Sequence, residues 1–274
     1  MDRQVREVGL RAVRGAAGET RTDLVACEEP LEIRVETPAG VVERIAVTMR
    51  TPGHDLELAL GFLLGEGVID GPSELGAPPA QEQAVLEGRG HVVTVRLRRS
   101  VDLEALRRNF YTTSSCGVCG KAAIERVELA APALEPGPRV PAAVVRSLPA
   151  ALRAAQPVFD LTGGLHATGL FRATGELVVA REDVGRHNAL DKVLGHALLA
   201  GAVPLATSLL LVSGRASFEL VQKAAMAGAP ILCAVSAPSS LAVDAALRLG
   251  LTLVAFLRGE TFQIYAHPER LELG

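Results

Sequence analysis

The second half of the chain alternates short apolar runs with amphipathic helical segments, and this alternation constrains the fold more than any other feature. Helices are expected at Asn188–Ala200, Phe218–Ala227 and Leu241–Leu249, with apolar residues at helical spacing. Strand-like runs are expected around them, at Leu177–Ala180, Leu209–Val212, Ile231–Val235, Leu251–Phe256 and Phe262–Tyr265. Short apolar strands between such helices are covered on both faces. The pattern therefore predicts a three-layer α/β domain.

The first half is organised differently. Leu31–Thr48 alternates apolar and charged residues around Pro38-Ala39-Gly40, which predicts a hairpin, and a helix and a further strand are expected after it. Five of the 16 prolines lie between Ala130 and Pro149, which favours a connecting segment there. We therefore predict a smaller N-terminal α+β domain over residues 20–130 and a C-terminal α/β domain over residues 140–274.

Charge and composition exclude some classes of protein. Lys and Arg number 28 against 31 Asp and Glu, a net charge of −3, so the basic excess that drives nucleic-acid binding is absent. Residues 193–214 and 224–243 contain no charged side chain, but glycines and prolines interrupt both stretches, which favours buried helix–strand units over membrane spans. Four cysteines are too few for a disulfide framework, and the charged N-terminus lacks a signal-peptide pattern. We expect a cytoplasmic protein.

Small and basic residues follow the predicted strands. They form the segments Ser213-Gly214-Arg215, Ser236–Ser240 and Arg258-Gly259-Glu260-Thr261. Ligands collect outside the carboxyl ends of strands in open α/β sheets, and exposed backbone N–H groups beside arginines suit phosphate. Ordinary turn chemistry is the alternative, since the chain has neither a Walker motif nor a dinucleotide-binding fingerprint.

The segment YTTSSCGVCGK carries a Cys-x-x-Cys at Cys116 and Cys119. It suits a zinc site, a dithiol redox pair or a thiol that carries sulfur. A structural zinc site usually has a second cysteine or histidine pair, which the sequence lacks. A zinc deaminase needs a His-x-Glu upstream of its Cys-x-x-Cys, and no His-x-Glu precedes Cys116. Flanking glycines and Lys121 favour a mobile, activated thiolate.

These cysteines, together with the segments FDLTGGLHATGLF, REDVGRHNALDKVLG, LLVSGRASFELVQKAAMAGAPIL and MRTPGHDLELALGFLLGEGVI, resemble the FdhD family, the formate dehydrogenase accessory sulfurtransferases. The resemblance extends from about Glu28 to Pro268. It implies a protein that takes sulfur from a cysteine desulfurase as a persulfide and passes it to the molybdenum (or tungsten) bis-molybdopterin guanine dinucleotide cofactor. The client is formate dehydrogenase.

By the same resemblance, the persulfide is expected on Cys116, with Cys119 as its partner, and the cofactor-binding stretch falls on Phe256, Leu257, Arg258, Gly259, Glu260 and Thr261. It further implies a C-terminal domain similar in fold to cytidine deaminases, a homodimer and no structural metal. The alternative is a cofactor-binding chaperone whose cysteines hold a metal or sense redox state.

Four further residues are weaker candidates. His187 and Asn188 open a predicted helix, where capping is the alternative to ligand contact, and His166 ends a segment that is expected to be a turn between strands. Cys233 lies in an apolar run and is expected to be an inert core thiol.

Overall fold

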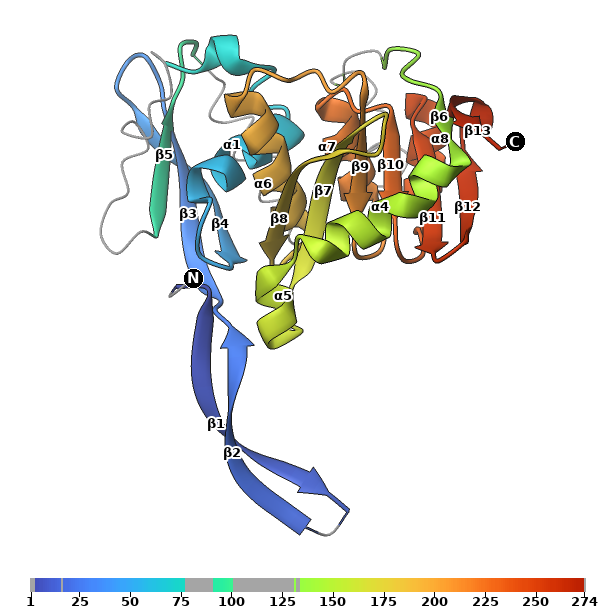
Figure 1. Ribbon diagram of the computed structural model, residues 1–274. Coiled ribbons are helices and arrows are strands. Elements are labelled where there is room, and N and C mark those ends of the chain that lie inside the picture. The colour runs from blue at the N-terminus through green and yellow to red at the C-terminus, as the bar shows by residue number, and fades with distance from the viewer. Residues whose placement is uncertain (1–2, 16, 77–90, 101–130, 132–133, 274) are drawn as a thin grey trace.

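Six strands form the central sheet of the computed structural model, which describes residues 3–15, 17–76, 91–100, 131 and 134–273 (Figure 1). The order is β12-β11-β10-β9-β7-β8; β9, β10 and β11 are parallel, whereas β7, β8 and β12 run antiparallel to their neighbours. The bounds are β7 His166–Arg172, β8 Leu177–Asp183, β9 Ser208–Val212, β10 Ile231–Ala234, β11 Thr252–Arg258 and β12 Thr261–Ala266. The five predicted strands are confirmed, and β7 is an addition that the sequence analysis did not foresee.

Helices cover both faces of this sheet, which confirms three layers. One face packs against three helices that match the predicted ones: α6 Arg186–Leu199, α7 Phe218–Met226 and α8 Ser240–Leu249. The other face packs against α4, Ala142–Ala154, through Val145, Leu148 and Leu152.

The expectation of a connecting segment up to Pro149 was wrong for residues 142–149. The proline-rich part ends at Pro141, and α4 begins at the next residue with Pro149 inside it. A proline within a helix removes one backbone hydrogen bond. The buried apolar stripe of α4 outweighs that loss, because three large side chains at helical spacing leave water together.

A second, smaller sheet and a helix occupy the N-terminal half. The strand order is β4-β3-β5, with bounds β3 Glu29–Glu36, β4 Val42–Arg50 and β5 Val92–Arg96, and the predicted hairpin and strand are confirmed. The helix that follows is α1, Asp55–Gly65, which ends where Gly67 adopts a left-handed conformation (φ 69°).

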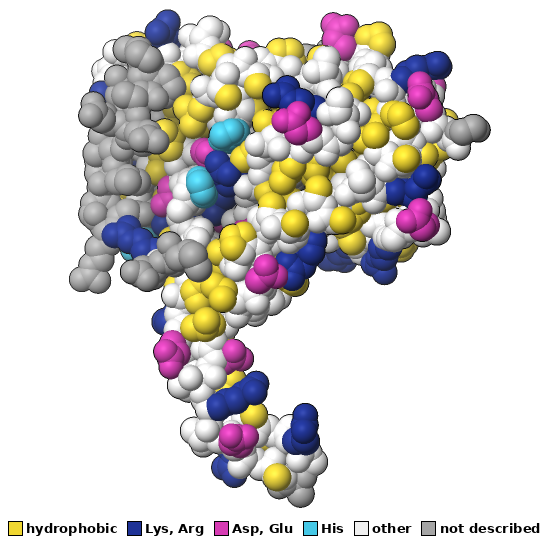
Figure 2. Space-filling view, in the orientation of Figure 1, with side chains coloured by type: hydrophobic (Ala, Val, Ile, Leu, Met, Phe, Trp, Pro, Cys, Tyr) yellow, Lys and Arg dark blue, Asp and Glu magenta, His cyan; other side chains and the backbone are white. Residues whose placement is uncertain are grey.

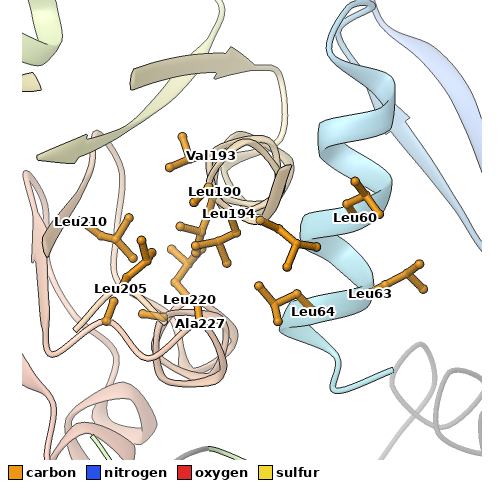
Figure 3. Packing of buried hydrophobic residues seen from close by; sticks show 14 of the residues in the cluster. Leu60, Leu63, Leu64, Leu190, Val193, Leu194, Leu205, Leu210, Leu220 and Ala227 are labelled. Atoms are coloured by element: carbon orange, nitrogen blue, oxygen red, sulfur yellow. The ribbon is translucent and has the colours of Figure 1, made fainter. Parts of the chain in front are cut away.

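Helices α1 and α6 pack so closely that the backbone of one lies against the backbone of the other. A Cβ atom built on Gly61 would lie 1.8 Å from the carbonyl oxygen of Asp191, and one built on Gly195 would lie 1.8 Å from that of Glu57. The contact therefore requires glycine at both positions. Figure 3 shows Leu64 of α1 pointing toward the leucines of α6 and α7, with Leu63 on the other side of α1, and all belong to one buried cluster. The main hydrophobic core thus includes residues from both predicted domains, and the boundary between residues 130 and 140 stays a prediction.

A long β-hairpin projects from the body at the end of the molecule where β8 and β11 finish (Figure 1). Its strands are β1, Val5–Arg14, and β2, Ala17–Ala26, paired in register from Val5↔Ala26 to Arg14↔Ala17. Side chains of both charge signs and hydrophobic side chains share its surface (Figure 2). The sequence analysis did not predict this hairpin. We call it the arm.

The remaining elements are short. They are α5 Pro157–Thr162, β6 Val140–Pro141 paired with β13 Leu271–Glu272, and single 3₁₀ turns at Pro72–Glu74 and Pro268–Arg270. Among the described residues, no helix has the length and apolarity needed to span a bilayer.

Candidate functional site

The three loops predicted at the strand ends lie side by side. Backbone hydrogen bonds link them: Ser236 N donates to Gly214 O (3.2 Å), Ala216 N to Ala237 O (3.1 Å) and Phe256 N to Ser236 O (3.1 Å). The loops after β9, β10 and β11 therefore form one continuous edge, as expected for neighbouring parallel strands. We call this surface the loop edge.

The turn between β11 and β12 is strained. Phe256 has a positive φ of 51°, a conformation that bulky side chains rarely adopt, and Gly259 has a φ of 52°. The Thr261 hydroxyl donates to the carbonyl oxygen of Arg258 (3.2 Å), which closes the turn. Strain of this kind persists where surrounding structure enforces it, and it clusters at functional sites.

Side chains of this turn point in different directions. Arg258 is exposed, and its Nε donates to the carbonyl oxygen of Val235 (3.0 Å). Glu260 is 92% exposed and pairs with Arg146. Leu257 is fully buried in the core against α4, so only its backbone is available to a ligand.

The loop after β9 lies against the start of β7. Ser213 and Ala167 exchange two hydrogen bonds of 2.9 Å, from Ser213 N to Ala167 O and from Ala167 N to the Ser213 hydroxyl oxygen. A Cβ atom on Gly214 would lie 3.3 Å from His166 Nδ1 and 3.7 Å from Arg186 Cδ. His166 and Arg186 therefore face the same small residue, and His166 begins β7 rather than lying in a turn.

Three arginines place positive charge on or beside the loop edge. Arg186, Arg215 and Arg258 form no ion pair with a carboxylate in the described part of the chain. The Nε of Arg186 is buried and has no hydrogen-bond partner among the described residues. Burial lowers the pKa of His166, and the charges of Arg186 and Arg215 lower it further. A neutral imidazole between two cations indicates a site suited to an anion.

His187 is a neutral, half-buried neighbour of this edge. Burial is the main cause that lowers the pKa of His187 to about 4, and the charge of Arg186 is the second. The Nε2 of His187 lies 3.1 Å from the hydroxyl oxygen of Ser217, the N-cap residue of α7, and 3.8 Å from a carboxylate oxygen of Glu219. The imidazole can accept a hydrogen bond from Ser217, because it is uncharged at neutral pH.

Asn188 is not the cap of α6, because the helix begins at Arg186. Its side chain is buried and donates to the carbonyl oxygen of Met49 (2.7 Å) and to Asp183 Oδ1 (3.0 Å), and its Oδ1 accepts from the Thr48 hydroxyl (3.1 Å). Asn188 therefore joins β4 to the central sheet.

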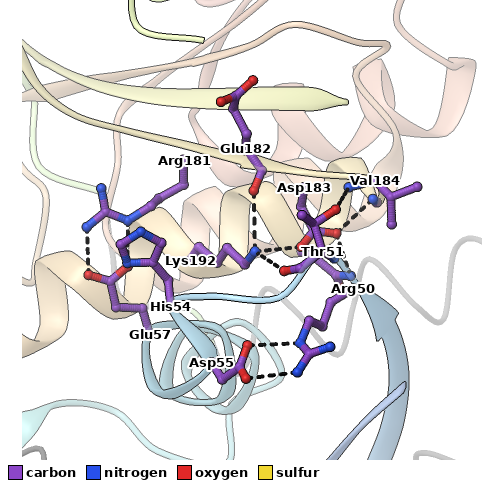
Figure 4. Close-up of polar contacts among 12 residues, drawn as sticks. Arg50, Thr51, His54, Asp55, Glu57, Arg181, Glu182, Asp183, Val184 and Lys192 are labelled. Carbon is purple, nitrogen blue, oxygen red and sulfur yellow. Dashed lines mark hydrogen bonds and ion pairs between the residues drawn. The ribbon is translucent and has the colours of Figure 1, made fainter. Parts of the chain in front are cut away.

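A fully buried ion pair lies beside Asn188 (Figure 4). Lys192 Nζ is 2.7 Å from Asp183 Oδ2, and neither side chain is exposed to solvent. Lys192 also donates to the carbonyl oxygen of Thr51 (2.8 Å), while the Thr51 amide donates to Asp183 (3.1 Å). The motif from Arg181 to Lys192 thus fixes the β4–α1 loop to the body.

A second polar cluster joins α1 to β8 and α6. Arg181 holds Glu57 through two hydrogen bonds of 2.6 and 2.7 Å, and both His54 Nδ1 (3.1 Å) and His196 Nδ1 (3.0 Å) contact the same carboxylate. Burial alone would raise the pKa of Glu57, but the bonds from Arg181 and the histidines lower it well below its usual range. These side chains hold the fold, and none lies on the loop edge.

The predicted sulfur-carrying residues Cys116 and Cys119 lie outside the described residues. Cys233 is buried in β10, and burial raises the pKa of its thiol to about 12, which agrees with an inert core residue. Cys27 is partly buried at the base of the arm. In the described ranges, no three His, Cys, Asp or Glu side chains are grouped so as to hold a metal ion.

Sequence reasoning missed Arg186. The residue lies between a strand and a helix, where an arginine is usually a solvated side chain. Its only signal was the proximity of His187 in the motif REDVGRHN, which joins β8 to α6. The approach of Arg186 to Gly214 depends on the antiparallel placement of β7 and β8, which periodicity does not specify.

The sheet, its helical layers and the loop edge define a three-layer α/β protein with a positively charged ligand-binding candidate at the strand ends. The sequence pattern of the FdhD/NarQ family matches residues 26–272. The chain therefore belongs to the FdhD/NarQ family.

Individual relatives are similar over nearly the whole chain. The sulfur carrier protein FdhD of Streptomyces avermitilis is 52% identical over 268 residues, which cover 95% of this chain and 93% of the relative. The protein of the same name from Mycolicibacterium paratuberculosis is 52% identical over 258 residues, covering 92% and 93%. A crystal structure described as a formate dehydrogenase accessory protein from Desulfotalea psychrophila superposes with a TM-score of 0.75 at 27% identity, covering 98% of this chain and 100% of that one.

Proposed function

We propose that this protein is a sulfurtransferase that serves the maturation of formate dehydrogenase. The observation that carries the proposal is the 52% identity, over 95% of the chain, to a relative named sulfur carrier protein FdhD. The name of the structural neighbour, an accessory protein of formate dehydrogenase, supports the same client. A cytoplasmic location is part of the proposal, supported by the low cysteine content.

The proposed sulfur carrier is Cys116, with Cys119 beside it. The Cys116 thiolate attacks the outer sulfur of a persulfide on a cysteine desulfurase, a new S–S bond forms on Cys116, and the desulfurase cysteine leaves as its thiolate. This exchange balances without an added oxidant. It requires a thiol that ionises readily, which the buried Cys233 does not provide.

The proposed sulfur acceptor is the molybdenum bis-molybdopterin guanine dinucleotide cofactor, bound as a substrate on the loop edge. The donor set fits such a ligand, because the cofactor carries phosphates and the edge offers Arg215 and Arg258 without carboxylate partners in the described ranges. The turn from Phe256 to Thr261 adds backbone groups held in a strained conformation. The proposed C-terminal domain, residues 140–274, holds this edge, and its likeness to cytidine deaminases is part of the proposal.

A homodimer is the proposed assembly, and the arm supports it. An isolated two-stranded hairpin is marginally stable at best in water. The first eight residues of β2 are all exposed, whereas Val8, Leu10 and Ala12 line one face of β1 and are only partly exposed. A second copy of the chain would cover this face of the arm.

Intact mass spectrometry tests the sulfur-carrying role. After incubation with a cysteine desulfurase and cysteine, the chain should gain about 32 Da for one sulfur atom. The Cys116→Ala variant should gain none and should fail to restore formate dehydrogenase activity, whereas Cys27→Ala should behave as the unaltered chain. Full maturation by Cys116→Ala would instead favour a chaperone that binds the cofactor without carrying sulfur.

A further inference from the structure

Three charged side chains meet inside the body where helices α1, α6 and α7 pack together. Asp191 of α6 and Lys223 of α7 are 2% and 4% exposed, and Lys223 Nζ lies 2.8 Å from Asp191 Oδ1. The same ammonium group lies 3.3 Å from Oε1 of Glu66, which follows the last residue of α1 and is 22% exposed. We call these three side chains the helix junction.

Neighbouring residues hold Lys223 in this position. Its stem runs past Gly65, where an added Cβ atom would lie 2.6 Å from Lys223 Cγ, so a larger residue would displace the lysine. Its ammonium group also lies 5.0 Å from the centre of the Phe62 ring. The preceding residue, Gln222, donates to the carbonyl oxygen of Gly65 (3.1 Å). The cation is therefore fixed between the end of α1 and the middle of α6.

The helix junction holds two carboxylates and only one ammonium group. If both carboxylates were ionised, one negative charge would stay uncompensated in a buried place, which is costly. The closest lysine on α6, Lys192, is already paired with Asp183 of β8. His187, also on α6, is neutral above about pH 4. Glu66 is partly exposed and keeps some of its hydration, so the excess charge affects Asp191 most.

The ion pair between Asp191 and Lys223 is incomplete. Neither Asp191 Oδ1 nor Lys223 Nζ makes a hydrogen bond of good geometry within the described part of the chain. Burial raises the pKa of Asp191 to about 6, although the charge of Lys223 opposes the rise. The charges of Glu66 and Asp183 add to it. Burial also lowers the pKa of Lys223, but the two carboxylates raise it by more, so the amine stays charged.

We propose that the helix junction is a latch operated by one proton. When Asp191 carries the proton, the ammonium group of Lys223 pairs with Glu66 alone and holds the end of α1 against α7. When Asp191 releases the proton to solvent, two carboxylates share one cation, and the end of α1 is held less firmly. The latch thus makes the docking of α1 depend on pH between about pH 5 and pH 7.

Carbon-13 NMR of the full chain, labelled at its aspartate carboxyl groups, tests the latch directly. One aspartate should titrate near pH 6, and its signal should be absent from the Asp191→Asn variant. Glu66→Gln removes the competing carboxylate, so the same titration should move to lower pH. Glu176→Gln removes an exposed carboxylate and is the matched control, which should leave the titration unchanged.

Hydrogen exchange gives the structural readout. The amides of Glu66, Gly67 and Val68 donate to carbonyl oxygens of α1, so their protection reports how firmly its end is held. After correction for the intrinsic exchange rate, their protection should fall by about 10-fold from pH 5 to pH 7 in the unaltered chain. It should stay nearly constant over this range in Asp191→Asn.

The pH dependence of stability checks the sign. The pKa of Asp191 is raised on folding, so its contribution to stability is complete below pH 3.8 and is lost as the pH rises through about 6. The unfolding constant of the unaltered chain, divided by that of Asp191→Asn, should therefore rise by about 100-fold from pH 4 to pH 7. Histidines titrate in both chains and cancel in this ratio.

A constant ratio from pH 4 to pH 7 would overturn the proposal, as would an aspartate that titrates near pH 6 in both chains. Glu66→Gln alters a partly exposed side chain, so it keeps the test valid if Asp191→Asn does not fold. In that case, an Asp191 titration that stays unchanged in Glu66→Gln would overturn the latch, because the two carboxylates would then not share the cation.

Discussion

Lys192 and Asp183 form the most deeply buried ion pair that the structure describes. Both side chains are fully inaccessible. The Thr51 amide on the β4–α1 loop donates to Asp183, and the Thr51 carbonyl oxygen accepts from Lys192 (Figure 4). Burying two charges costs solvation free energy that their attraction offsets only when the geometry is complete. Such a pair mainly selects one position of the β4–α1 loop against the body, and it adds little net stability.

Removing one partner of this pair should be costly. Lys192→Met leaves the Asp183 carboxylate buried without its cation, and we expect a loss of about 3–5 kcal/mol in unfolding free energy. Urea denaturation measures it. The double variant with Asp183→Asn should lose less than the sum of the two single losses. Arg172→Met, which breaks an exposed pair with Glu176, should change stability by less than about 1 kcal/mol. Similar small losses for both variants would contradict the role assigned to Lys192.

Glu57 should make stability depend on acid pH. Burial alone would raise the pKa of this carboxyl, but Arg181 and two histidines hold it charged, so its pKa in the folded protein lies below the ordinary value of 4.5. The stabilisation is therefore complete above pH 4.5 and is lost as the pH falls below it. Glu57→Gln should be less stable than the unaltered chain by about 2 kcal/mol at pH 7, and the difference should shrink between pH 5 and pH 3.

Urea midpoints measured at several pH values test this dependence. Glu260→Gln is the control, because Glu260 is 92% exposed. A constant difference between Glu57→Gln and the unaltered chain from pH 7 to pH 3 would show that the carboxylate charge plays no part.

At the scale of elements, the contact between α1 and α6 is decided by two glycines. Gly61 and Gly195 let the helix backbones touch, and buried leucines of both helices pack in the same hydrophobic cluster (Figure 3). Glycine inside a helix costs about 1 kcal/mol relative to alanine. The close approach offsets this cost, because it also brings Glu57 within reach of Arg181 and His196.

Gly195→Ala and Gly61→Ala should each destabilise the protein despite the better helix propensity of alanine. The added methyl group would meet a backbone carbonyl at 1.8 Å, so the helices must separate, and overpacking of this kind costs about 3 kcal/mol. Thermal unfolding measures the loss. Gly9→Ala, whose Cβ meets nothing within 4 Å, should leave the midpoint nearly unchanged. A stabilised Gly195→Ala variant would mean that the helices are not held at this distance.

At the scale of the whole molecule, the arm is mostly exposed and makes few contacts with the rest of the described structure. Its base is held near Gly164, and the Cys27 amide donates to the carbonyl oxygen of Gln4 (2.8 Å), but most of its side chains are exposed. A surface that is partly apolar on one face and extends away from the body suits an interface between two copies related by a two-fold axis.

Removing residues 1–26 should convert the proposed homodimer into a monomer. Light scattering should give twice the chain mass of 28.7 kDa for the full protein and the mass of a single shortened chain after truncation. A single substitution sharpens the test. Leu10→Arg alters the partly buried face of the arm, and Thr22→Arg alters the opposite face. Only Leu10→Arg should weaken the dimer, and an unchanged mass for the truncated chain would place the interface elsewhere.

The sequence by itself determined the elements of the C-terminal half and their three-layer arrangement. Apolar periodicity is a local property, so the helices α6, α7 and α8 and the strands around them follow from residues close in the chain. The sequence also predicted that the loops after β9, β10 and β11 share one edge of the sheet, because the carboxyl ends of parallel strands lie at the same edge. The family also follows from the sequence, since its motifs are fixed runs of residues.

Only the tertiary structure decided which side chains meet. Lys192 and Asp183 lie on a helix and a strand, Asn188 reaches Met49 across 139 positions, and Arg186 meets Gly214 and His166 through antiparallel strand pairing. Each contact depends on how far apart two elements pack and on their direction, which are set by side-chain volumes summed over the core. The arm escaped prediction for a related reason: its strands bury too little apolar surface to leave a clear period in the sequence.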